Sequence, residues 1–386
     1  MTNDATTDLK TAESTKPVYG ETVSAGKKSI DPFKIRPNKK RVMVLSGLLI
    51  VLLIIAGYIW WQRSHNTTGS APLTNIFSGV VAPAPAPKAD APLTGLKVDP
   101  DAAKKPVVGV MIENLDPDAR PQSGLGDAGI VYEALAEGGI TRFLALFQTP
   151  APAIVGPIRS LRPYYLDWGL EHNAPIVHAG GSQPALEAIV PRGLKNVEAL
   201  VYGAPYFYRA TDRLAPHNLY AKTDGIDAIL AKLGFNTEPK FTTLTRKDDA
   251  VQAAPAHPKI DIDFSSDSYA VSYQFDSTSD SYARTLAGVP HKDRNTDKQI
   301  MVKNIVVEYV PTTYGTQQDG KPETDYAIVG TGKALVFEDG DVTTATWIKA
   351  DHASVTKLTN SDGKDITFNR GNTWYEVIPT DKTVTY

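Results

Sequence analysis

One uncharged apolar run, residues 42–61, constrains the organisation of this 386-residue chain more than any other feature. At a rise of about 1.5 Å per residue, a helix of this length spans roughly the 30 Å hydrocarbon layer of a bilayer. Five cations directly precede the run: Lys34, Arg36, Lys39, Lys40 and Arg41. Only Arg63 follows it closely. Since cations favour the cytoplasmic side, the pattern predicts a single-pass cell-membrane protein with a cytoplasmic N-terminus and an extracytoplasmic folded part.

A cleaved signal peptide is the alternative for this run. However, 41 residues precede it, which is long for a signal peptide, and no small-residue cleavage site follows it. The sequence therefore favours an uncleaved anchor. The chain contains no cysteine, which excludes disulfides, thiol catalysis, cysteine-ligated metals and lipid attachment through a cysteine.

The segments that flank the anchor differ in composition from the rest of the chain. Residues 1–41 lack hydrophobic periodicity and are predicted to be a disordered cytoplasmic tail. Residues 62–104 include an alternating Ala-Pro stretch, which predicts an extended extracytoplasmic linker. Beyond Arg63 the chain carries 30 Lys or Arg and 38 Asp or Glu, a net charge of −8. This balance argues against nucleic acid as a partner.

Residues 105–249 have the pattern of an α/β unit. Continuous apolar segments predict strands at 107–112, 143–147 and 176–178, and spacings of three and four predict helices at 126–137 and 160–172. This alternation predicts a mainly parallel or mixed sheet covered by helices.

Residues 250–386 show a different pattern. Period-two segments at 271–275, 305–310, 334–337 and 366–368 predict strands, separated by Asp-Gly turns at 319–320, 339–340 and 362–363. A mainly antiparallel β unit is therefore expected. The sequence leaves open whether the two parts are separate domains or share one sheet.

The first group of candidate site residues follows the first predicted strand. It contains Arg120, Gln122, Ser123 and Asp127. Ligands of open α/β sheets bind beyond the carboxyl ends of strands, so this loop is a candidate binding site. Asp127 is also the candidate metal ligand, and the alternative is that it only caps a helix.

The second group lies around the start of the predicted helix 160–172. It contains Arg159, Ser160, Arg162 and Tyr164, with Arg142 a candidate for the same crevice. Two arginines three residues apart at a helix start can converge on one phosphate or carboxylate. The alternative is that Arg159 and Arg162 form structural salt bridges with Glu133, Glu137, Asp167 or Glu171.

The third group follows the strand predicted at 176–178. His178 is a candidate proton donor or ligand-binding residue, and Ser182 a candidate ligand-binding residue or helix cap. A single strand histidine is more often structural, and no second histidine stands at metal-ligand spacing. His217 and Asn218, in a loop, are further candidates for hydrogen bonds to a ligand.

Read in order, these segments resemble the YerB-like family of bacterial surface lipoproteins, whose domain has no assigned function. The segments that carry the resemblance in the first part are 119–124, Asp127 with 130–133, 137–142, 156–160 with 162–164, and 178–182. A C-terminal companion domain is matched by 282–284, 288–291, Asn304 and 371–374. The chain differs from the lipoprotein pattern in carrying a predicted transmembrane helix instead of a lipidated cysteine. The resemblance implies a folded part that is tethered outside the cytoplasm, and no reaction.

Three functions are compatible with these observations. The leading hypothesis is an envelope protein that binds an anionic ligand or an envelope partner: a polymer, a lipid-linked phosphate or a protein. The alternative is a Mg²⁺-dependent phosphotransferase or hydrolase that acts on a polyprenyl phosphate, similar in layout to LytR-CpsA-Psr enzymes. There Asp127, with Glu113 or Asp167, would hold Mg²⁺ and arginines would neutralise the phosphates. A third hypothesis makes the β-rich part a protein-interaction module.

Overall fold

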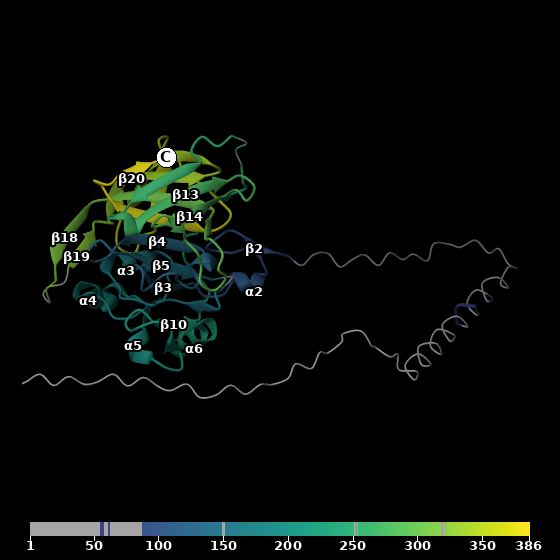
Figure 1. Cartoon of the computed structure of the whole chain (residues 1–386), viewed down its shortest axis with the longest axis horizontal. Helices are drawn as coiled ribbons and strands as arrows, with labels where there is room; N and C mark the ends of the chain where they lie inside the picture. The colour runs from purple at the N-terminus through teal and green to yellow at the C-terminus, as the bar shows by residue number, and fades with distance from the viewer. Residues whose placement is uncertain are drawn as a thin grey trace, which may run out of the picture. The chain divides into compact units, whose positions relative to one another are not determined.

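The computed structural model describes residues 55–57, 61, 87–148, 151–250, 252, 254–317, 320 and 322–386 (Figure 1). The segment Pro83–Tyr386 forms one compact unit that is mostly β. The predicted tail 1–41 and most of the predicted span 42–61 lie outside the described residues. Within the described residues, no helix has both the length and the apolar content needed to cross a membrane.

A ten-stranded mixed sheet forms the centre of the unit, in the order β22-β21-β20-β17-β24-β4-β5-β3-β7-β8. Its strands are β3 (Val108–Glu113), β4 (Ile130–Leu135), β5 (Thr141–Phe147), β7 (Ile176–His178), β8 (Asn196–Glu198), β17 (Asn304–Val310), β20 (Gly330–Glu338), β21 (Asp341–Lys349), β22 (Lys357–Asn360) and β24 (Thr373–Pro379). Strand β24 pairs in parallel with β17 on one side and with β4 on the other. The two parts of the chain therefore share one continuous sheet.

The prediction of a helix at 126–137 is wrong. Residues Leu125–Asp127 form a short 3₁₀ turn, and β4 follows it. All six residues of β4 are buried, including Tyr132 and Glu133. The apolar spacing that suggested a helix is also compatible with a strand covered on both faces, because such a strand lacks the alternation of apolar and polar residues. The chain turns at Gly138 and Gly139, both with positive φ, and β5 pairs antiparallel to β4.

Within the compact unit, the α-helices all fall between residues 100 and 233. They are α2 (Pro100–Ala103), α3 (Pro163–Glu171), α4 (Gln183–Arg192), α5 (Ala199–Tyr202) and α6 (Thr223–Leu233). The predicted helix at 160–172 is confirmed as α3, and β7 confirms the strand at 176–178. Trp168 of α3 stacks on Tyr132 of β4 with ring centroids 4.9 Å apart, which fixes α3 on the sheet. Parallel α/β character is limited to β3, β7 and β8 with these helices.

A second, antiparallel sheet covers part of the first, as Figure 1 shows for β13 and β14 beside β4. It contains β12 (Lys259–Asp263), β13 (Ala270–Asp276), β14 (Ser281–Leu286), β15 (Val289–Pro290), β16 (Met301–Val302) and β25 (Val384–Thr385). The strands predicted at 271–275, 305–310 and 334–337 are confirmed. Of 366–368, only Phe368 lies in a strand, β23 (Phe368–Asn369), which pairs with β11 (Arg246–Lys247).

Three smaller features complete the unit. Strands β6 (Ile154–Val155), β10 (Leu219–Lys222) and β9 (Phe207–Arg209) form a small antiparallel sheet, and β18 (Thr312–Thr316) pairs with β19 (Pro322–Tyr326). Strands β1 (Ala89–Asp90) and β2 (Lys97–Val98) fall within the segment predicted as linker. Leu93 between them is 2% exposed and belongs to the core. The linker therefore ends before Ala89, because β1 and β2 are paired and Ala91, Leu93 and Thr94 between them are buried.

Candidate functional site

The candidate arginines are each paired with a carboxylate of the chain. Arg162 and Arg142 both contact Glu137, at 2.5 and 2.6 Å. Burial opposes ionisation of Glu137, but these two guanidinium groups lower its pKa below the ordinary value. Arg159 lies 3.0 Å from Glu113 at the end of β3. The structure therefore shows the salt-bridge arrangement for Arg159 and Arg162, with a different carboxylate for each.

Other residues of the second group stabilise the fold around this pair of salt bridges. The hydroxyl of Tyr164 donates to the carbonyl of Leu135 at 2.6 Å, and Arg142 donates to the carbonyl of Ser160 at 2.9 Å. His217 contacts both carboxylate oxygens of Glu113 at 3.0 Å through Nδ1. Glu113 is thus shared by Arg159 and His217 at the carboxyl end of β3.

The residues of the third group are mainly structural. His178 is fully buried, with Nδ1 2.9 Å from the carbonyl oxygen of Gly180 and Nε2 2.6 Å from Oδ1 of Asn196. Ser182 occupies the N-cap position of α4, but its buried hydroxyl makes no hydrogen bond within the described part of the chain. The position of this cap is as predicted, whereas the capping hydrogen bond is not formed.

The first group leads into a buried polar network between the two sheets. The side-chain nitrogen of Gln122 donates to Oδ1 of Asn114 at 2.7 Å, and its side-chain oxygen lies 2.9 Å from Nε2 of His291. Arg120 donates to the same Asn114 oxygen at 2.9 Å. Nδ1 of His291 lies 2.5 Å from Arg284 on β14. This network connects the loop after β3 with the C-terminal part of the chain.

Arg284 is the cation at the centre of this network. It is fully buried, pairs with Glu133 of β4, and donates from Nε to the hydroxyl of Tyr273 at 3.0 Å. Its guanidinium carbon lies 4.7 Å from the ring centroid of Trp374. Burial and the nearby Glu133 raise the pKa of Glu376, whose carboxylate accepts a hydrogen bond from Tyr273. These side chains form a joint between the sheets, with no ligand needed to satisfy Arg284.

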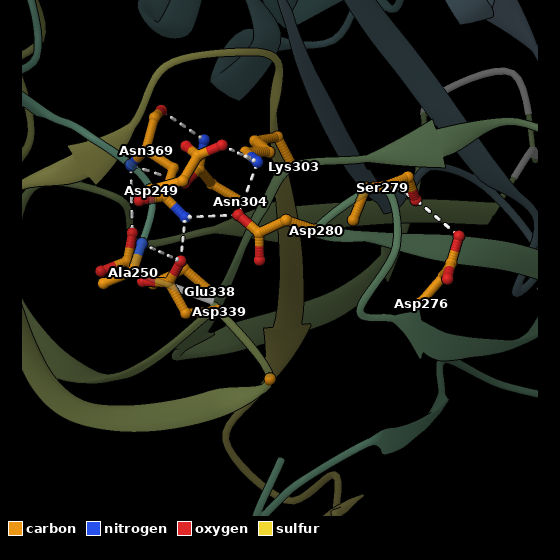
Figure 2. Close-up of polar contacts among 12 residues, drawn as sticks. Asp249, Ala250, Asp276, Ser279, Asp280, Lys303, Asn304, Glu338, Asp339 and Asn369 are labelled. Atoms are coloured by element: carbon orange, nitrogen blue, oxygen red, sulfur yellow. Dashed lines mark hydrogen bonds and ion pairs between the residues drawn. The ribbon is translucent and has the colours of Figure 1, made fainter. Parts of the chain in front are cut away.

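A second polar cluster lies where Asn304 and Asn369 approach the β20–β21 turn (Figure 2). Lys303 contacts Asp280 at 2.6 Å and Asp249 at 2.7 Å. Asn369 donates to Asp339 at 2.7 Å, and its backbone N–H donates to Oδ1 of Asn304 at 3.0 Å. Lys247 also contacts Asp339. Because lysines already neutralise these carboxylates, the cluster is a cross-link between chain segments.

No group of three or more His, Asp or Glu side chains in the described ranges is arranged to hold a metal ion. Glu113 is bound to Arg159 and His217, and Asp167 contacts Arg192 at 2.5 Å and His352 at 2.6 Å. Burial and the nearby Asp293 raise the pKa of Asp127, which makes it a poorer anion. Glu113 and Asp167 are thus engaged with cations, and burial disfavours the charged form of Asp127.

The described part of the chain contains a cavity of about 590 Å³ beside the loop after β3, and its walls are partly polar and partly apolar. Its lining includes Ser123, Tyr208, Arg209, Asp212, Tyr220, Arg294 and Asn295. Ser123 comes from the first predicted group, whereas the cavity's two arginines were not among the candidates. Arg209 and Arg294 are 85 positions apart in the sequence, so no local motif joins them.

Loop contacts hold the cavity walls in place. The backbone N–H of Arg294 donates to the carbonyl of Gln122 at 2.8 Å, and its side chain pairs with Asp212. Asn218 accepts from Arg209 at 2.8 Å and donates to the carbonyl of Ala210 at 2.9 Å. The predicted residue Asn218 therefore positions a cavity arginine. The two parts of the chain both contribute to the cavity, through β9 and the loop after His291.

The fold and the inter-sheet joint define a two-domain protein whose domains share one sheet. Two family descriptions match it: residues 93–236 match "Protein of unknown function (DUF3048) N-terminal domain", and residues 260–375 match the corresponding C-terminal domain. The chain is 33% identical over 299 residues to "Putative lipoprotein YerB" of Bacillus subtilis (strain 168), covering 77% of this chain and 88% of that protein.

The comparison with solved structures agrees with the sequence comparison. The crystal structure of the YerB protein from Bacillus subtilis superposes with a TM-score of 0.69 at 32% identity, covering 78% of this chain and all of that chain. The chain therefore belongs to the YerB-like family, and the resemblance noted from its sequence is confirmed.

Proposed function

We propose that this chain is a membrane-tethered cell-envelope protein that binds an anionic ligand in the cavity beside Ser123. The predicted anchor 42–61 and the name of its relative YerB, a putative lipoprotein, both support a tether. The cavity supports the ligand class, because it contains Arg209 and Arg294 against one carboxylate, Asp212. This excess of guanidinium groups is the observation that carries the proposal, since arginine binds carboxylate and phosphate in bidentate geometry.

Arg209 is the cation most accessible to a ligand. It is exposed, and the only side-chain hydrogen bond that it makes with the described residues goes from one terminal nitrogen to Asn218. Arg294 is committed to Asp212 and, at 3.3 Å, to the hydroxyl of Tyr220. Arg209 therefore supplies the free donors, and Arg294 supplies positive charge and shape.

Binding is tested with the full chain in detergent micelles, by calorimetric titration with pyrophosphate as the charge probe. We expect Arg209→Gln to weaken binding by at least about tenfold, the equivalent of one lost charge-assisted hydrogen bond. Lys357→Gln removes the same charge from an exposed position in β22, outside the cavity, and should leave binding unchanged. Equal binding of pyrophosphate by wild type and Arg209→Gln would contradict the proposal.

The tether is tested separately through the absence of cysteine from the chain. Single variants Thr6→Cys and Lys357→Cys are treated with a membrane-impermeant maleimide on intact cells that produce the chain. We expect Lys357→Cys to be labelled and Thr6→Cys to be labelled only after lysis. Labelling of Thr6→Cys on intact cells would overturn the proposed orientation.

A further inference from the structure

We propose that the anionic ligand of the cavity is an acidic sugar residue of a glycan, a pyranose ring that carries a carboxylate. This inference rests on the proposed function and names the ligand class of the same site. It is carried by an exposed aromatic ring, a free guanidinium group and a mixture of hydrogen-bond donors and acceptors around one cavity.

The aromatic part is a pair of tyrosines from neighbouring strands. Tyr208 of β9 and Tyr220 of β10 are paired in register and stack with ring centroids 6.1 Å apart and planes 29° apart. Tyr220 is 1% exposed, whereas Tyr208 is 37% exposed. The buried ring therefore supports the exposed one. A rigid exposed ring offers a flat apolar surface to the C–H face of a sugar, while its hydroxyl remains available for a hydrogen bond.

The charged part is next to these rings. Arg209 lines the same cavity as Tyr208, and the guanidinium carbon of Arg294 lies 5.9 Å from the ring centroid of Tyr220. The free nitrogens of Arg209 can bind both oxygens of a carboxylate. A ring stacked near Tyr208 can thus present an acidic substituent to the adjacent arginine.

The remaining polar groups favour a sugar over a bare phosphate. Asn295 donates to the carbonyl of Ile154 at 2.8 Å, and its side-chain oxygen has no partner among the described residues. Asp212 adds a carboxylate acceptor, and Ser123 adds a hydroxyl. Phosphate oxygens only accept hydrogen bonds at full ionisation, so they cannot use Asp212 or the Asn295 oxygen. Sugar hydroxyls donate as well as accept, and can use both.

The test titrates the full chain in detergent micelles with three probes: a panel of glucuronate-, galacturonate- and muramate-containing oligosaccharides, their carboxyl-reduced counterparts, and pyrophosphate. We expect at least one acidic oligosaccharide to bind, and its carboxyl-reduced counterpart to bind at least about tenfold more weakly. Tyr208→Ala should weaken binding of that oligosaccharide by at least about tenfold and leave pyrophosphate binding unchanged. Arg209→Gln should weaken both.

Two further variants separate loss of the ring from loss of folding. Tyr208→Phe keeps the ring and should bind the oligosaccharide within about threefold of wild type, a difference below 1 kcal/mol. Tyr314→Ala removes an exposed tyrosine outside the cavity, 63% exposed in β18, and should change nothing. The thermal midpoint of each variant shows whether the fold is retained.

Three results would overturn the sugar inference. If pyrophosphate binds in an Arg209-dependent manner and no acidic oligosaccharide binds, the inference fails and the proposed function stands. If oligosaccharide binding is the same in Tyr208→Ala and wild type, the stacking role fails. If neither probe class shows Arg209-dependent binding, the proposed function fails as well.

Discussion

Replacing Arg284 with methionine should destabilise the whole compact unit. The side chain is fully buried, and it is paired with the fully buried carboxylate of Glu133 and lies 3.8 Å from that of Glu376. Arg284→Met removes the cation and leaves the buried carboxylate of Glu133 without its charged partner between the sheets. Removing one partner of a buried ion pair costs about 3–5 kcal/mol, a large fraction of the total stability of about 5–15 kcal/mol.

The magnitude depends on the uncompensated charge and not on lost volume, because methionine fills much of the space of the arginine stem. A second substitution tests this point. Glu133→Gln keeps an oxygen for Thr141, which donates to Glu133 at 2.6 Å, and removes the negative charge. The double variant Arg284→Met/Glu133→Gln should therefore lose less stability than the sum of the two single variants, by about 1–3 kcal/mol of coupling.

The assay is urea unfolding of the full chain in detergent micelles, followed by tryptophan fluorescence, since Trp374 lies against Arg284. Stability is taken from the midpoint at constant slope. Lys357→Met, at an exposed position in β22, serves as the control and should change stability by less than about 0.5 kcal/mol. A loss below about 1 kcal/mol for Arg284→Met, or strict additivity in the double variant, would show that Arg284 and Glu133 do not stabilise the unit as a buried ion pair.

Three other predictions concern stability. Arg162→Gln should cost about 1.5–3 kcal/mol and Arg159→Gln less, by urea unfolding, because their side chains are 9% and 25% exposed. A chain that lacks residues 1–104 should be less stable than one that lacks 1–86 by at least about 2 kcal/mol, because it loses the buried Leu93. Equal urea midpoints of the two truncated chains would show that residues 87–104 belong to the linker. Burial, with Glu171, raises the pKa of Glu308 to about 8 from an ordinary 4.5, so the folded state retains a proton that the unfolded state releases. Stability should therefore fall as the pH rises toward 8, and Glu308→Gln should flatten this fall. The stabilities of wild type and Glu308→Gln are compared between pH 6.5 and 8. Burial lowers the pKa of His172 to about 3, so this histidine reduces stability only below pH 6.5, outside that range. An unchanged slope in Glu308→Gln would contradict the assignment.

Local patterns in the sequence were sufficient for elements with a distinctive period or flanking signal. Strands such as β17 and β20, and helix α3 with Pro163 at its start, are where the pattern places them. The β4 segment was not predictable in this way. A strand buried on both faces and a buried helix turn both read as apolar runs, and only the pairing with β5 and β24 decides between them.

The pairing of charges was beyond sequence reasoning for a related reason. Arg159 and Arg162 are three residues apart, yet Arg159 contacts Glu113 at the end of β3 and Arg162 contacts Glu137 in the turn after β4. The partner of each arginine is set by the arrangement of β3, β4 and β5. Likewise, Arg294 reaches the cavity only because the second sheet packs on the first.

The joint between the sheets also determines the geometry of the cavity. The side chain of Gln122 contacts His291 inside the network, while its carbonyl accepts from the N–H of Arg294 at the cavity wall. The segments that carry the family resemblance therefore have mainly an internal role, and the cavity lies beside the joint that they build. Arg284→Met should therefore weaken ligand binding as well as stability, although Arg284 is not among the residues that line the cavity. Lys357→Met, which leaves the joint intact, should change neither.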